Sequence, residues 1–148
     1  MSYTQLNYHL VFSTKDRRSW LGPEIMPRLR EYLGGIIRNL GGQMLAANGS
    51  GDHVHVATVL NQKRPLMEIL QELKQSSSKW IHQEFPDLRA FAWQDGYAAF
   101  TVSHSGMPQV VEYIAQQVPH HHRQTFVEEL IALLERHGVQ YDERYITT

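Results

Sequence analysis

Residues 51–59, Gly-Asp-His-Val-His-Val-Ala-Thr-Val, limit the fold more than any other stretch of the chain. β-Branched and small residues dominate it, and turn-forming residues stand on both sides, which is typical of a strand. Side chains alternate between the faces of a strand, so His53 and His55 share one face while Val54 and Val56 share the other. The chain is therefore expected to build a sheet with one face against a core and two imidazoles on the opposite face.

The two histidines allow two interpretations. Residues two apart on a strand are separated by about 6.5–7 Å at the backbone, and two imidazoles can close that gap onto one divalent ion. They can equally be polar side chains on the wet face of an amphipathic strand. A bare His-x-His motif is short and common, so the rest of the chain must decide between a metal site and a solvated face.

Length and composition indicate one soluble globular domain over residues 1–148. A chain of 148 residues with 42% hydrophobic and 20% charged residues can bury a proper core and is not disordered. No apolar run approaches the roughly 20 residues that span a bilayer, and the N-terminus does not resemble a secretory signal. The chain contains no cysteine, which excludes disulfides, thiol catalysis and cysteine-ligated zinc. We expect a cytoplasmic protein.

The charge balance restricts how the protein can bind nucleic acid. The formal net charge is −1 with the histidines neutral, whereas nucleic-acid binders usually carry a basic excess. Positive charge would have to be concentrated locally, or supplied in part by a metal. Nine histidines indicate metal binding, acid–base chemistry or simple surface use, and only their placement can decide.

Apolar periodicity predicts a regular order of strands and helices. Strands are expected over residues 6–13, 43–48, 51–59 and 97–104, and helices over 24–39, 66–85, 108–118 and 124–137. Asn48-Gly49 predicts a hairpin turn between the second and third strands. The β-α-β-β-α-β order is that of the α+β split βαβ fold, also called ferredoxin-like or RRM-like. It has an antiparallel sheet with helices on one face, leaving the other face free for a ligand. Two C-terminal helices are added to it.

Two further features belong to the first strand and the loop after it. His9 alternates away from Tyr8 and Leu10, which would place it near His53 and His55 if the strands are neighbours. A basic cluster of Lys15, Arg17 and Arg18 follows the strand. It is either a solvated loop or a set of phosphate contacts.

A second chemical pair lies on the helix after Pro108. Tyr113 and Gln117 are four residues apart, so they share one helical face. Alone, a tyrosine beside a glutamine is unremarkable. Joined to His53 and His55, the pair completes a set of two imidazoles and one amide oxygen, which suits Mg²⁺ or Mn²⁺ with open positions. Tyrosine is a competent nucleophile toward phosphorus, and a metal can neutralise a phosphodiester and stabilise its leaving oxygen.

With these motifs the chain resembles the single-tyrosine HUH transposases, the small TnpA-type enzymes of IS200-like bacterial insertion sequences. The matching stretches are residues 8–15, 52–55, 91–97, 99–103, 111–117, 120–121 and 126–129. They cover nearly the whole length. The His-apolar-His pair is weak alone, but a later tyrosine with an amide four residues on makes the combination specific.

The resemblance implies a specific chemistry. His53, His55 and Gln117 would bind the divalent metal, Mg²⁺ or Mn²⁺, and Tyr113 would be the catalytic nucleophile. Tyr113 would attack single-stranded DNA near hairpins at the element's ends, leaving a 5′-phosphotyrosine and a free 3′-OH. Rejoining would reverse this step without ATP. The resemblance also implies a homodimer, in which the tyrosine helix can complete the partner's site, and the sequence leaves action in cis or in trans open.

The remaining candidates come from the residues themselves. Lys15, Arg17 and Arg18 are our candidates for DNA binding, together with stacking on exposed aromatic residues such as Trp93. The run 120–122 of three histidines is interpreted as the polar start of the last helix. The other three histidines, His82, His104 and His137, are interpreted as surface or structural residues.

Two other functions stay open at this point. A split βαβ sheet with an exposed face also suits a non-catalytic module that binds single-stranded nucleic acid. A small metallohydrolase could use His53 and His55 with a water nucleophile.

Overall fold

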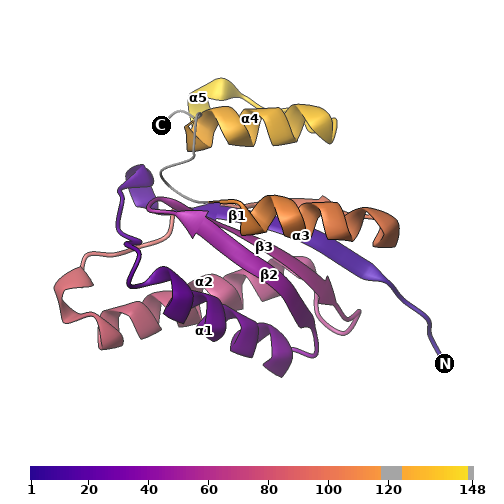
Figure 1. The fold of residues 1–148 in the computed structure, drawn as a ribbon, viewed down its shortest axis with the longest axis horizontal. Coiled ribbons are helices and arrows are strands. Elements are labelled where there is room, and N and C mark those ends of the chain that lie inside the picture. The colour runs from indigo at the N-terminus through magenta and orange to yellow at the C-terminus, as the bar shows by residue number, and fades with distance from the viewer. Residues whose placement is uncertain (118–124, 147–148) are drawn as a thin grey trace.

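The computed structural model describes residues 1–117 and 125–146 and has a four-stranded antiparallel sheet with strand order β2-β3-β1-β4 (Figure 1). The strands are β1 (Leu6–Ser13), β2 (Gln43–Ser50), β3 (His53–Leu60) and β4 (Ala98–Thr101). The helices are α1 (Met26–Asn39), α2 (Leu66–Glu84), α3 (Met107–Ala115), α4 (Phe126–Arg136) and α5 (Glu143–Ile146), with 3-10 turns η1 (Lys15–Arg17), η2 (Pro86–Leu88) and η3 (His104–Gly106). The α+β class is confirmed, and the histidine strand β3 is interior to the sheet. None of the described helices has the length and apolar character needed to cross a bilayer.

The alternation on β3 positions the core as the sequence predicts. Val54 and Val56 are fully buried in one apolar cluster with residues of α1 and α2, among them Leu29, Leu33 and Leu73. Apolar residues three and four apart form a single stripe on each helix, so each helix can bury that stripe against the sheet. Both helices lie on one side of the sheet in Figure 1.

The opposite face of the sheet, which the split βαβ arrangement alone would leave free, is covered by the additional C-terminal helices. Ile114 of α3 packs on Ala57 of β3, and Leu133 of α4 packs on Val11 of β1. Figure 1 shows α3 and α4 on the side of the sheet away from α1 and α2. The apolar stripes of these two helices need burial, and the histidine face of the sheet is the surface that they cover.

The hairpin between β2 and β3 turns later than predicted. Asn48 and Gly49 lie inside β2 and pair with β3, and the turn falls on Gly51 and Asp52. A Cβ atom on Gly49 would lie 2.0 Å from the backbone oxygen of His53. The glycine is therefore required for the close approach of two strands, and it does not form the turn.

Trp93 is a core residue, which contradicts its prediction as an exposed stacking residue. Its side chain is buried, and its ring packs edge-on against Phe12 and Phe91 with centroids 4.8 and 5.0 Å apart. Its indole Nε1–H donates a 3.0 Å hydrogen bond to the Ser77 hydroxyl. The ring of Trp93 is packed inside the protein and its N–H is hydrogen-bonded there. This side chain therefore cannot stack on a DNA base.

Trp93→Ala is expected to lower the free energy of unfolding by about 3–5 kcal/mol, because it leaves a cavity under the sheet. Urea unfolding measures the change. Met67→Ala, at an exposed position of α2, is the control and should stay within about 0.5 kcal/mol of the wild type. An equally small effect of Trp93→Ala would contradict the core assignment.

Candidate active site

The two strand histidines are buried and oriented by partners outside the site. His53 is 2% exposed, and its Nδ1–H donates a 2.8 Å hydrogen bond to Asp52 Oδ1. His55 is fully buried, and its Nδ1 shares a 2.8 Å hydrogen bond with His9 Nε2. The predicted approach of His9 to this pair is thus confirmed. Histidines that bind metals are held in this way, with the ring nitrogen away from the ion fixed by a neighbour.

Both inner nitrogens point at Glu129 of α4. Its Oε1 lies 3.2 Å from His53 Nε2 and 3.0 Å from His55 Nε2. The other carboxylate oxygen, Oε2, accepts hydrogen bonds from the Tyr113 hydroxyl and, at 2.9 Å, from Gln117 Nε2. Glu129 is 3% exposed, so one buried carboxylate joins two side chains of β3, Tyr113 of α3 and Gln117 just after α3.

Sequence reasoning assigned no role to Glu129, although it falls in a stretch that resembles the family. One signal was available. Leu133 is four residues further on, so Glu129 lies on the buried face of α4. A carboxylate in an apolar stripe is rarely buried without a partner. Thr125 caps the start of α4, because its hydroxyl accepts a hydrogen bond from the backbone N–H of Glu128. This cap fixes where the helix begins and therefore which face Glu129 occupies.

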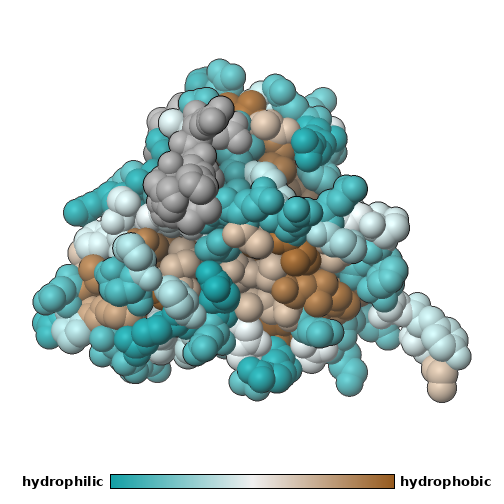
Figure 2. Space-filling model, viewed as in Figure 1, coloured by the Kyte–Doolittle hydropathy of each residue, from teal (hydrophilic) through white to brown (hydrophobic). Residues whose placement is uncertain are grey.

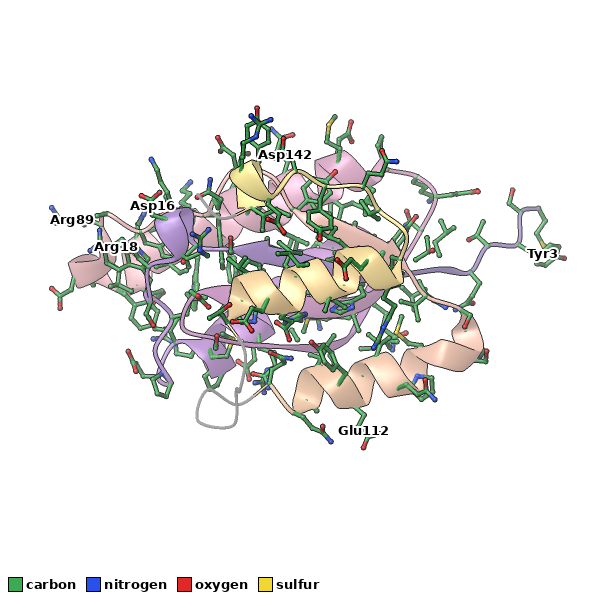
Figure 3. The ribbon with its side chains drawn as sticks, turned by 90° about the horizontal axis from the view of Figure 1, so that it is seen from above. Tyr3, Asp16, Arg18, Arg89, Glu112 and Asp142 are labelled. Atoms are coloured by element: carbon green, nitrogen blue, oxygen red, sulfur yellow. The ribbon has the colours of Figure 1, made fainter. Side chains whose placement is uncertain are left out.

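Helix α3 and the residues after it bring Tyr113 and Gln117 to the imidazoles. The Tyr113 ring lies 5.7 Å from the His55 ring and 6.2 Å from the His9 ring, between centroids. Gln117 lies just past the end of α3, which is shorter than predicted, and its side chain is 4% exposed. The predicted juxtaposition of phenol, amide and imidazoles is therefore present within one protomer. Glu112, the neighbour of Tyr113, points outward (Figure 3).

The side-chain oxygen of Gln117 differs from the other oxygen atoms of this cluster in its surroundings. Gln117 Oε1 is buried and accepts no hydrogen bond from the described part of the chain. An unsatisfied buried acceptor costs about 1–3 kcal/mol. Such a group is common at sites that bind a ligand or an ion.

The electrostatics follow from burial and the central carboxylate. Burial, reinforced by the hydrogen bond to Glu129, raises the pKa of Tyr113 above its usual value. Burial opposes the charge of Glu129, yet hydrogen bonds from His53 and His55 hold the pKa of this carboxyl well below its usual range. Burial, with the neighbouring His55, lowers the pKa of His9 to about 3. Glu129 is therefore ionised and His9 neutral near pH 7.

The donor set fits a divalent cation. His53 and His55 can each offer one nitrogen and Glu129 one oxygen, and these atoms all lie within 4.8 Å of one another. Gln117, whose amide nitrogen hydrogen-bonds Glu129, carries a further buried oxygen donor. Two imidazoles with carboxylate and amide oxygens suit Mg²⁺ or Mn²⁺, and thiolate ligands, which favour other metals, are absent from the sequence.

A cavity of about 230 Å³ reaches the nucleophile side of the cluster. Its lining includes His9, Tyr113, Glu129, Arg136 and His137. Tyr113 is 36% exposed, so the phenol is open to an incoming molecule while the imidazoles are not. Arg136 places a positive charge at the wall of a cavity that could hold a phosphate group.

The basic cluster of Lys15, Arg17 and Arg18 lies near His53, at the end of β1. Ser13, the last residue of β1, pairs with His53, and the loop after it carries Lys15, Arg17 and Arg18. Lys15 and Arg18 are exposed, and Figure 3 shows Arg18 projecting from the same end of the molecule as Arg89. Arg17 instead donates a 3.0 Å hydrogen bond to the backbone oxygen of Ile146.

The remaining histidines have the structural or surface positions that were predicted. His82 Nε2 hydrogen-bonds the backbone oxygen of Phe91 at 2.8 Å, His104 is exposed, and the His137 ring stacks on Phe100 with centroids 4.3 Å apart. The histidine run 120–122 lies outside the described residues.

Comparison with known proteins identifies relatives along most of the chain. The chain is 26% identical over 118 residues to the ISDra2 transposase TnpA of Deinococcus radiodurans, covering 76% of this chain and 84% of that protein. It is 29% identical over 130 residues to the transposase for insertion sequence element IS200 of Salmonella typhimurium, covering 80% and 82%.

Solved structures agree on the fold. A crystal structure of a Deinococcus radiodurans protein assigned as a transposase superimposes with a TM-score of 0.66 at 26% identity, covering 78% of this chain and 93% of that chain. A REP-associated tyrosine transposase bound to a REP hairpin gives a TM-score of 0.57 at 17% identity, covering 77% and 67%, and supports the fold alone. The family model for IS200-like transposases matches residues 2–117, well over half of the sequence, so the chain belongs to the IS200-like transposase family.

Proposed function

We propose that this transposase cleaves and rejoins single-stranded DNA at insertion-sequence ends, with Tyr113 as the nucleophile and a 5′-phosphotyrosine as the intermediate. One observation carries the proposal: the Tyr113 hydroxyl belongs to the same hydrogen-bonded cluster as His53 and His55. The carboxylate of Glu129 that holds this hydroxyl also contacts both imidazoles. A tyrosine with only a packing role would not need such a contact.

In the cleavage step, Tyr113 Oη attacks the scissile phosphorus. The new P–O bond forms as the bond from phosphorus to the 3′ oxygen breaks, the phenolic proton leaves, and the 3′ oxygen takes up a proton. Mg²⁺ or Mn²⁺ held by His53, His55 and Gln117 would neutralise the phosphate charge and stabilise the leaving oxygen. Attack on the phosphotyrosine by another strand's 3′-OH reverses the step and conserves the bond, so no ATP is needed.

The proposed substrate is a DNA hairpin with a single-stranded flank. The structural neighbour bound to a REP hairpin supports this choice for a protein of the same fold. The exposed Lys15 and Arg18, next to the His53 end of the site, are proposed to contact backbone phosphates. Arg17 belongs to the same proposed surface, although its guanidinium also contacts the C-terminal segment.

We expect the double variant Lys15→Ala/Arg18→Ala to weaken hairpin binding equally for all sequences. Loss of two phosphate contacts should lower the slope of log affinity against log salt by about 1.5. Fluorescence anisotropy over a salt series measures this slope. Lys63→Ala/Arg64→Ala is a matched control, because it removes the same charge from an exposed loop at the opposite end of β1. An equal loss in both double variants would contradict a local contact surface.

A homodimer is also part of the proposal. Strand β2 is at the edge of the sheet, and Figure 2 shows apolar side chains gathered over the region of β2 and α3. Leu45 of β2 is 38% exposed, and Val110 and Val111 of α3 are half-buried. An unpaired strand edge beside apolar side chains suits pairing with a second copy. One protomer nevertheless supplies the phenol, the amide and both imidazoles of its own site.

The test uses single-stranded DNA from the two ends of the element that encodes the protein, labelled at either end. With Mn²⁺, 3′-labelled DNA should give a covalent protein–DNA band on a denaturing gel, and 5′-labelled DNA a shortened strand with a 3′-OH. EDTA should remove both products. Binding without any adduct under all metals would support a non-catalytic module, and a free 5′-phosphate without adduct would support a metallohydrolase.

A further inference from the structure

We propose that Glu129 is itself a ligand of the divalent ion through Oε1 and holds the Tyr113 hydroxyl through Oε2, so that one carboxylate ties the nucleophile to the metal. This inference rests on the proposed function and adds a residue to it. Glu129 lies beyond residues 2–117, the segment that matches the family model.

The first argument is that the two carboxylate oxygens of Glu129 contact different groups. Among residues 1–117 and 125–146, Oε1 contacts the two imidazole nitrogens at 3.0 and 3.2 Å, and Oε2 accepts hydrogen bonds from Tyr113 and Gln117. Neighbouring ligands about 2.1 Å from an octahedral ion stand about 3 Å apart. Oε1 therefore already has the spacing of an adjacent ligand to each imidazole.

The second argument is charge. Glu129 is 3% exposed, and a buried carboxylate persists only where hydrogen bonds and positive charge compensate it. The two groups that donate to Oε2 are a phenol and an amide, neither of which carries a formal charge. A divalent ion between Oε1 and the two imidazoles supplies the charge that this carboxylate requires.

The third argument is independent of the acidic group. The Gln117 amide is fixed because its Nε2–H donates to Glu129 Oε2, and its Oε1 is buried with no partner among residues 1–117 and 125–146. Oε1 of Gln117 is thus a second buried oxygen donor on a side chain that Glu129 holds. Both donors are held by the same hydrogen bond, so removal of the Glu129 carboxylate should disturb both.

The experiment measures Mn²⁺ binding to the full chain without DNA, by isothermal titration calorimetry and by the EPR signal of free Mn²⁺. Glu129→Gln keeps the size of the side chain but removes its charge, and we expect it to weaken Mn²⁺ binding by at least about 10-fold. Glu128→Gln is the matched control, because Glu128 is the adjacent and exposed residue of α4, and it should bind within about twofold of the wild type.

Glu129→Asp covers the case in which the glutamine variant does not fold. It keeps the charge and withdraws both oxygens by one methylene, and we expect it to bind Mn²⁺ more weakly than the wild type. Wild-type affinity in a folded Glu129→Gln or Glu129→Asp protein would overturn the inference and leave the phosphotyrosine proposal standing. Conversely, weakened binding in these variants together with a wild-type protein that forms no adduct would support the ligand and defeat the proposed function.

Discussion

Tyr113→Phe is expected to abolish the covalent protein–DNA adduct, with cleavage falling by at least about 10⁴-fold. The change removes one oxygen atom, the only atom of that side chain that can bond to phosphorus. The ring should keep its place beside His55 and His9, because those contacts are made by ring carbons. Hairpin affinity should therefore change less than about twofold, and single-turnover cleavage of 3′-labelled DNA with Mn²⁺ measures the loss.

Tyr145→Phe is the control for this prediction. Tyr145 is 81% exposed on α5, and the variant should form adduct at the wild-type rate. If the adduct persisted in the Tyr113→Phe protein, Tyr113 would have no part in the chemistry, whatever its contacts. If binding were lost together with cleavage, the phenol would contribute to DNA binding and could not be assigned to bond breaking alone.

Half of the site could be predicted from the sequence because strand geometry fixes it. The alternation of His53 and His55 with Val54 and Val56 permits one orientation once a core exists, and antiparallel pairing of β1 with β3 places His9 beside them. Tyr113 and Gln117 were predicted together because a four-residue spacing is a single helical turn. These inferences depend on local periodicity, and the tertiary packing of this protein is consistent with that periodicity.

The rest depends on how separate elements pack, which no local spacing records. Glu129 reaches the histidines only because α4 folds back over the sheet, and nothing in the sequence fixes the position of α4 relative to β3. The sequence around Trp93 predicts an exposed loop. In the structure Trp93 pairs with Thr14, and its ring belongs to the core on one face of the sheet. Gly49 was assigned to a turn because Asn-Gly favours turns, whereas the close approach of β3 requires the glycine inside the strand.

His55→Gln is expected to reduce cleavage to the rate that the wild type shows in EDTA. Loss of a metal ligand removes several kcal/mol of charge stabilisation at the phosphate, and 4 kcal/mol corresponds to about a 10³-fold slower reaction. Glutamine can keep hydrogen bonds to His9 and Glu129, so the variant should fold, although an amide is a poorer ligand than an imidazole. Single-turnover rates over a Mn²⁺ series measure the effect, and EDTA should have little further influence on the variant.

His104→Gln makes the same chemical change at an exposed histidine of η3, outside the site, and should cleave like the wild type. A metal ligand and a merely structural histidine differ in one respect that this series can detect. If His55 were structural, His55→Gln would slow the reaction but leave its dependence on Mn²⁺ concentration unchanged. If His55 binds the ion, the concentration of Mn²⁺ at half-maximal rate must rise, and wild-type cleavage with an unchanged Mn²⁺ requirement would place the metal elsewhere in the protein.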